Sequence, residues 1–147
     1  MRLSSLADYA VVMMTAIARH CGGIARVNAT LLAGETGVPL PTAQKLVSRL
    51  SAAGLLDSTR GTGGGVRLSR PPASISLADI IEAVDGPIAL TGCDHETVPC
   101  ALDHRCHVKP HWAVVNAAVR DALAAVTLSK LAATPSAAAS VQPKVFA

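Results

Sequence analysis

Apolar residues recur at three- and four-residue steps along most of this chain, which is the spacing of one face of an α-helix. Glycine and proline interrupt the pattern and divide it into separate helices. The pattern predicts helices over residues 5–20, 28–37 or 30–37, 41–53, 76–85 and about 110–126, and a last short one over 127–131. The chain is therefore expected to be mainly α-helical.

One stretch departs from the helical spacing. Residues 55–59 and 66–70 each have the pattern of a short strand, and a glycine-rich run, 61–65, lies between them. Two short strands around a glycine turn predict a small β-hairpin. The hairpin follows two short helices joined by a tight turn that contains Gly37. This order of elements is typical of a winged helix-turn-helix.

Residues that favour helix ends support these boundaries. Ser5 followed by Asp8, and Ser76 followed by Asp79, have the spacing of N-terminal capping boxes. Cys21 lies where the first predicted helix ends, and we expect it to be an ordinary buried thiol.

The composition limits the class of protein. The chain has 147 residues, enough for a core that folds alone, and half of them are apolar although only three are aromatic. No apolar run reaches the roughly 18 residues of a transmembrane helix. The first residues do not have the apolar stretch of a signal peptide. We therefore expect a cytoplasmic protein that binds no membrane.

Charge is unevenly distributed along the chain. Residues 1–72 hold eight Lys and Arg against three Asp and Glu, a net charge of +5, whereas residues 73–147 hold five against seven, a net charge of −2. A basic first half favours a phosphate-rich partner. The glycine run is not a nucleotide-binding P-loop, because Val66 and a strand follow it where that motif has Gly-Lys-Ser or Gly-Lys-Thr and a helix.

The helix over 41–53 is apolar on one side and polar on the other, as a helix between a core and a DNA groove must be. Arg and Lys can pair with guanine, Gln with adenine, and Ser and Thr with phosphate. Glycines in the hairpin permit close approach of the backbone, and arginines beside them can enter a minor groove. The candidate DNA-binding residues are Thr42, Gln44, Lys45, Ser48, Arg49, Arg60, Gly63, Gly64, Arg67 and Arg70. The alternative is a solvated helix face and a hairpin without a ligand.

Three of the four cysteines, Cys93, Cys100 and Cys106, lie close together in the sequence. Clustered thiols in a cytoplasmic chain are more often metal ligands or redox groups than disulfides. Their spacing lacks the close pairs of structural zinc sites and favours an iron–sulfur cluster, which thiolates suit as ligands. Zinc, a thiol redox switch and no ligand at all stay open.

A four-ligand site needs one more side chain. The sequence offers a carboxylate or one of four histidines, His95, His104, His107 and His111. His107 directly follows Cys106, so the two cannot easily reach the same site, and His111 is better spaced.

With these motifs in place, the chain resembles the family of winged helix-turn-helix regulators that contains IscR, NsrR and RirA. The resemblance covers about residues 1–132 and rests on Leu6-Ala7-Asp8-Tyr9-Ala10, Gly54-Leu55-Leu56, the segments 60–68 and 75–81, and the three cysteines. Residues 86–93 and Pro110-His111-Trp112 are similar, more narrowly, to regulators of SUF iron–sulfur assembly genes.

The resemblance implies a homodimer in which the helix from about residue 110 crosses its partner's equivalent. It divides the chain into a winged helix-turn-helix DNA-binding region over 1–72 and a cluster-binding loop with the dimerisation helix over 73–132. We expect the tail over 133–147, rich in Ala, Ser and Pro, to be disordered.

One position departs from the family pattern. IscR-type proteins have a histidine three residues after the last cysteine, where this chain has Lys109. In NsrR-type proteins an aspartate in helix 1 of the other subunit completes the site, and Asp8 matches that residue. Asp8 of the partner subunit, His111 and His107 are therefore the candidates for the fourth ligand.

These features together predict a sensor of an iron–sulfur cluster, [2Fe–2S] or [4Fe–4S], that binds a double-stranded DNA operator and represses SUF genes when loaded. No nucleophile–base pair or paired acids are present, so we expect neither an enzyme nor a small-molecule substrate. A nitric-oxide or thiol-redox sensor on the same scaffold is the first alternative. A zinc-stabilised interaction module is the second.

Overall fold

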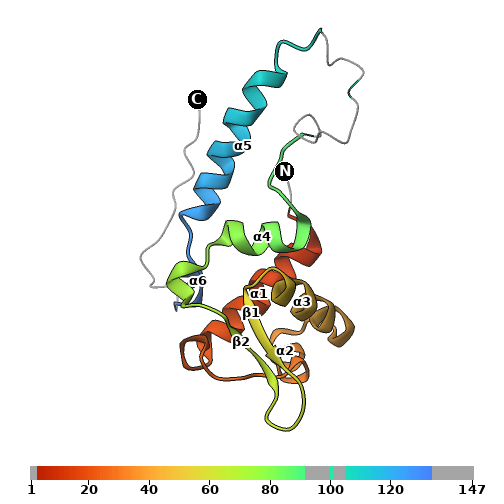
Figure 1. Cartoon of the computed structure of the whole chain (residues 1–147), viewed down its shortest axis with the longest axis vertical. Coiled ribbons are helices and arrows are strands. Elements are labelled where there is room, and N and C mark those ends of the chain that lie inside the picture. Colours follow the sequence, from red (N-terminus) through yellow and green to blue (C-terminus); the bar gives the residue numbers. More distant parts are fainter. Residues whose placement is uncertain (1–2, 92–99, 101–104, 134–147) are drawn as a thin grey trace.

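The computed structural model describes residues 3–91, 100 and 105–133. It is mainly helical with one antiparallel hairpin, which confirms the predicted fold class (Figure 1). In chain order the elements are α1 (Ser5–Arg19), the short 3-10 turn η1 (Cys21–Gly23), α2 (Ala29–Thr36), α3 (Leu40–Ala52), β1 (Leu56–Thr59), β2 (Gly65–Leu68), the 3-10 turn η2 (Pro72–Ser74), α4 (Leu77–Asp85), α5 (Lys109–Ala124) and α6 (Leu128–Ala132).

Helix α1 lies at the centre of the core. One of its faces is fully buried by α2, α3, α4 and α6, through Ala10, Met13, Met14 and Ile17. These positions have helical spacing, so a single stripe of α1 contacts all four partners. The core is otherwise aliphatic, as the low aromatic content requires.

The cap of α1 differs from the prediction. The capping residue is Ser4, not Ser5: the Ser4 hydroxyl accepts a hydrogen bond from the Ala7 N–H at 3.0 Å and donates to Oδ1 of Asp85 at 2.7 Å. Asp8 takes no part in a capping box, and its side chain is exposed. Ser4 also contacts the distant Asp85, a partner that local spacing does not reveal.

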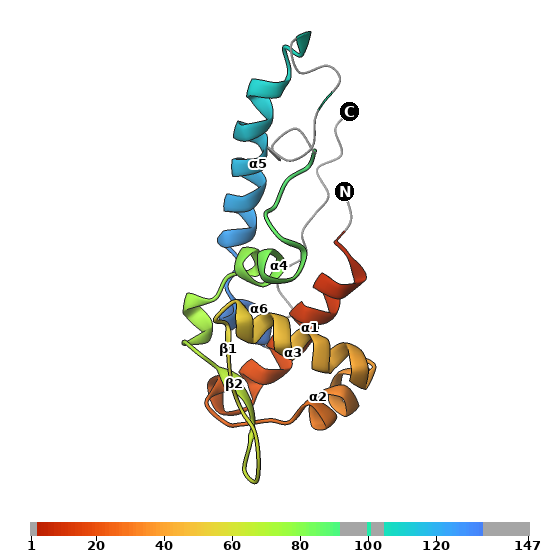
Figure 2. The same ribbon diagram turned by 45° about the vertical axis from the view of Figure 1, so that its right-hand side comes forward.

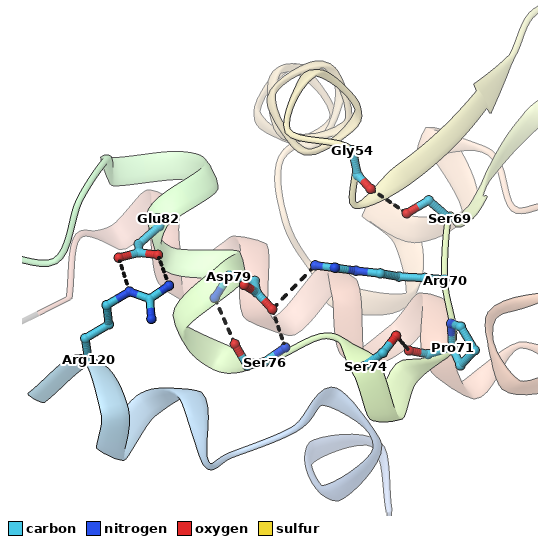
Figure 3. Close-up of polar contacts among 9 residues, drawn as sticks. All are labelled: Gly54, Ser69, Arg70, Pro71, Ser74, Ser76, Asp79, Glu82 and Arg120. Atoms are coloured by element: carbon cyan, nitrogen blue, oxygen red, sulfur yellow. Dashed lines mark hydrogen bonds and ion pairs between the residues drawn. The ribbon is translucent and has the colours of Figure 1, made fainter. Parts of the chain in front are cut away.

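The second capping box is confirmed. The Asp79 N–H donates to the Ser76 hydroxyl at 3.1 Å, and the Ser76 N–H donates to the Asp79 carboxylate at 2.8 Å (Figure 3). Helix α4 ends at Asp85, and its C-cap Gly86 has a positive φ of +87°, which glycine adopts readily because it has no Cβ.

The helix-turn-helix is formed by α2 and α3. Asn28 caps α2 by accepting the Leu31 N–H at 2.7 Å, and Gly37, at a φ of +72°, ends it. Helix α3 buries Ala43, Leu46 and Leu50 against the core. Its start at Leu40 is one residue earlier than predicted, within the usual uncertainty of helix ends.

The hairpin of β1 and β2 forms the wing. Its register pairs Leu56 with Leu68 and Asp57 with Arg67. A third segment joins it at the base, because Val27 and Val66 exchange two backbone hydrogen bonds of 2.9 and 2.7 Å. The sequence pattern did not indicate this bridge, which connects the wing to the residues just before α2.

Helix α5 stands away from the body, at the end opposite the wing (Figures 1 and 2). Asn116 is its only buried residue, whereas Val114 is 70% exposed and Val115 39% exposed. Apolar residues of α5 therefore lack a complete cover from the described part of their own chain. No helix among the described residues is long and apolar enough to cross a membrane.

Candidate nucleic-acid interface and cysteine segment

The outer face of α3 is polar and open to solvent. Gln44, Lys45 and Ser48 are exposed, and Thr42 is half-buried. Among the described residues, none of the three exposed side chains has a hydrogen-bond or ion-pair partner within the protein. Their donors and acceptors are therefore available to bases or phosphates.

Arg49 has a different position from its neighbours on α3. Its Nη1 donates a 2.8 Å hydrogen bond to the carbonyl oxygen of Val84, near the C-terminal end of α4. The sequence grouped Arg49 with the DNA-contacting residues, but in the structure its guanidinium contacts a neighbouring helix.

The wing carries several cations around a glycine tip. Arg60 is exposed and has no partner among the described residues, and Gly61 and Gly63 adopt φ values of +96° and +75°. Arg67 lies across the hairpin from Asp57, with Nη2 3.5 Å from Oδ2. The opposite face of the same strand buries Val66 and Leu68 in the core. The alternation of β2 therefore directs Arg67 outward.

Two further arginines lie near the base of the wing. Arg70 is 3.5 Å from the Asp79 carboxylate (Figure 3). Arg26 is exposed, and its Nη1 lies 3.4 Å from the Gly65 carbonyl oxygen. The sequence pattern does not indicate a role for Arg26, because only the bridge between Val27 and Val66 places Arg26 beside the wing.

The cysteine segment, residues 93–106, is described only in part. Cys100 and Cys106 are half-buried and free, and Cys106 lies three residues before α5 begins. Cys93, His95 and His104 lie outside the described residues. Cys21, expected to be buried, is exposed, and it adopts a φ of +49° in η1 just after α1.

The candidates for a fourth ligand are all on the surface. Asp8, His107 and His111 are exposed. No three His, Cys, Asp or Glu side chains of the described residues come together as a metal site. The donor chemistry nevertheless fits an iron–sulfur cluster, since Cys100 and Cys106 offer two soft sulfur ligands that form no disulfide.

A salt bridge joins α4 to α5. Arg120 donates to both Glu82 oxygens, at 3.0 and 3.1 Å (Figure 3). The hydrogen bonds and negative charge of Glu82 raise the pKa of Arg120 above its ordinary value. The planar guanidinium holds the carboxylate in a defined geometry.

Comparison with known proteins agrees with this architecture. The family model described as "Rrf2: Iron-dependent Transcriptional regulator" matches residues 3–134. The HTH-type transcriptional regulator IscR of Vibrio cholerae is 34% identical over 134 residues, which cover 89% of this chain and 75% of IscR.

Solved structures of similar fold include two regulators of this kind. The structure of CymR, the global cysteine regulator of B. subtilis, has a TM-score of 0.68 at 27% identity and covers 90% of this chain and 96% of CymR. T. potens IscR has a TM-score of 0.64 at 27% identity, over 89% of this chain and 85% of IscR. The chain therefore belongs to the Rrf2 family and is a DNA-binding transcription regulator, not an enzyme.

Proposed function

We propose that this regulator senses an iron–sulfur cluster and represses SUF iron–sulfur assembly genes when it is loaded. The observation that carries the proposal is that Cys100 and Cys106 are free, half-buried thiols and that Cys106 lies three residues before α5. The 34% identity to the V. cholerae IscR supports it further. The segments 86–93 and 110–112 support the SUF target. Such a regulator acts in the cytoplasm, where its operator lies.

DNA binding in this proposal depends on α3 and the wing. In a homodimer joined along α5, two α3 helices and two wings would bind a palindromic operator. Gln44, Lys45 and Ser48 would contact bases and phosphates in the major groove, with Thr42 beside them. Around the glycines Gly63 and Gly64, Arg60 and Arg67 would contact the adjacent backbone or minor groove. The exposed apolar residues of α5 support this pairing of two chains.

Cys93, Cys100 and Cys106 would hold the cluster. When bound, the cluster would be a group whose presence depends on iron supply and on oxidants. Asp8 is the fourth ligand we favour, from a second copy of the chain, because its carboxylate is exposed and free of any capping role. His111 and His107 are the other candidates.

The test of this function compares two forms of one protein. Protein purified without oxygen is expected to be brown and to have visible cluster absorption. We expect the loaded form to bind the operator at least tenfold more tightly than the cluster-free form in gel-shift titrations. Colourless protein that contains zinc would overturn the proposal, and so would equal affinity of the two forms at every operator.

The wing gives a second prediction. Arg67→Ala should weaken operator binding by roughly fivefold and reduce the slope of log Kd against log salt by about one, because one phosphate contact is lost. Lys130→Ala is the matched control: it removes the same charge from α6, whose Lys130 binds the Ala125 carbonyl oxygen within its own chain. An unchanged salt slope for Arg67→Ala would mean that the wing arginine does not contact phosphate.

A thiol-redox regulator is the second candidate. The free, half-buried thiols favour it as well, and an oxidised form of the S. aureus CymR, 29% identical with a TM-score of 0.66, has been solved. This candidate predicts colourless protein whose operator affinity changes on oxidation of the cysteines. Membership of a family of DNA-binding regulators removes the zinc-stabilised interaction module from the alternatives.

A further inference from the structure

The C-terminal end of α4 is held from two sides. From α3, Arg49 donates its 2.8 Å hydrogen bond to the Val84 carbonyl oxygen. The last carbonyl groups of a helix have no partner within the helix and carry partial negative charge, so a guanidinium stabilises them. From the N-cap of α1, the Ser4 hydroxyl donates to the Asp85 carboxylate at 2.7 Å. Arg49 thus closes the end of one helix while belonging to another.

The same part of α4 is bound to α5. Glu82, two residues before Val84, accepts both hydrogen bonds of Arg120. The segment after α4 is also tied to α5, because the Leu90 N–H donates to Oδ1 of Asn116 at 3.0 Å. Helix α5 in turn begins three residues after Cys106.

Described residues therefore form a continuous path from the cysteine segment to the DNA-binding helix. The path runs from Cys106 into α5, through Arg120 and Glu82 to α4, and through Val84 and Arg49 to α3. We infer that Arg49 is a positioning residue that fixes the placement of α3 according to the position of α4, and not a residue that contacts bases. The regulatory part of this inference rests on the proposed function.

The physical reason lies in the geometry of the contact. A guanidinium bound to a helix-end carbonyl is directional, so a small shift of α4 moves α3 or breaks the bond. Packed helices move between discrete arrangements because their interface is close-packed. A change that begins at Cys106 is thereby passed to the face that holds Gln44 and Lys45.

The test uses the full-length protein and a duplex selected by the wild type from random sequence. Operator Kd is measured over a series of salt concentrations for loaded and cluster-free protein. For Arg49→Gln we expect the ratio of the two Kd values to fall at least fivefold toward one, with the salt slope unchanged. Lys45→Gln, one helical turn earlier on the exposed face, is the matched control. It should weaken both forms equally and lower the slope by about one.

Hydrogen exchange provides a readout that needs neither DNA nor a cluster. In cluster-free protein, Arg49→Gln should speed exchange of the Asp85 and Gly86 amides at least threefold, because the end of α4 loses its external hydrogen bond. Lys45→Gln should leave these amides unchanged. Unchanged exchange in Arg49→Gln overturns the positioning role.

The two proposals fail in different ways. If wild-type protein binds DNA equally with and without a cluster, the sensing function is wrong, while hydrogen exchange and the salt slope still decide the role of Arg49. If the wild type responds to the cluster and Arg49→Gln keeps that ratio, the inference is wrong. A salt slope that falls by about one in Arg49→Gln would make Arg49 a DNA contact and would likewise overturn it.

Discussion

Cys106→Ser is expected to abolish cluster binding and with it the difference in operator affinity between loaded and cluster-free protein. A serine hydroxyl is not deprotonated at neutral pH and is a hard ligand, whereas iron–sulfur clusters are held by soft thiolates. Cys106 is half-buried just before α5, so its replacement also removes the ligand closest to the helix that we place at the dimer interface. Visible absorption should fall to about a tenth or less of the wild-type value.

Cys21→Ser is the matched control for this experiment. Cys21 is an exposed free thiol in the turn η1 that follows α1, and it is not one of the three clustered cysteines. We expect it to keep the full cluster absorption and the full response of operator affinity. Circular dichroism of both variants should match the wild type, since the exchange of sulfur for oxygen is small. A Cys106→Ser protein that keeps its colour would exclude Cys106 as a ligand.

Gly65→Ala is expected to detach the wing from the body and to weaken operator binding by roughly tenfold or more. Gly65 has a φ of +144°, and a Cβ at that position would lie 2.8 Å from the Val27 carbonyl oxygen. That oxygen accepts the Val66 N–H, so the new methyl group displaces the strand bridge. Backbone strain and lost hydrogen bonds together should lower the free energy of unfolding by about 2–4 kcal/mol.

The measurement is thermal unfolding beside gel-shift titration. A loss of this size corresponds to a fall in Tm of roughly 5–15 °C. Gly34→Ala is the control, because Gly34 lies within α2, is exposed and has open space where a Cβ would stand. Alanine should raise the stability of that helix by about 0.5–1 kcal/mol. Equal stability and affinity of Gly65→Ala and the wild type would show that the bridge does not hold the wing.

The sequence by itself determined the local structure of this protein. Helix ends are set within a few residues by side-chain caps and by glycine, so Gly37 and the Ser76–Asp79 box were readable directly, and Asn28 was one of two predicted starts of its helix. The hairpin was readable because its strands are joined by a short glycine-rich turn. The outward polar face of α3 followed from helical spacing alone. Family resemblance then added the regulatory function that spacing cannot give.

Only the tertiary structure decided which partners these elements have. Ser4 replaces Ser5 as the cap of α1 and reaches Asp85, Val27 joins the wing, and Arg49 turns to α4. Each of these contacts joins residues 35 or more positions apart, which become neighbours only when the elements pack around α1. The periodicity of a helix or strand indicates which face a side chain occupies. The hydrogen-bond partner of that side chain depends on which other element packs against that face. For that reason the hydrogen bond from Arg49 to the Val84 carbonyl oxygen could not be predicted from the position of Arg49 on a polar helix face.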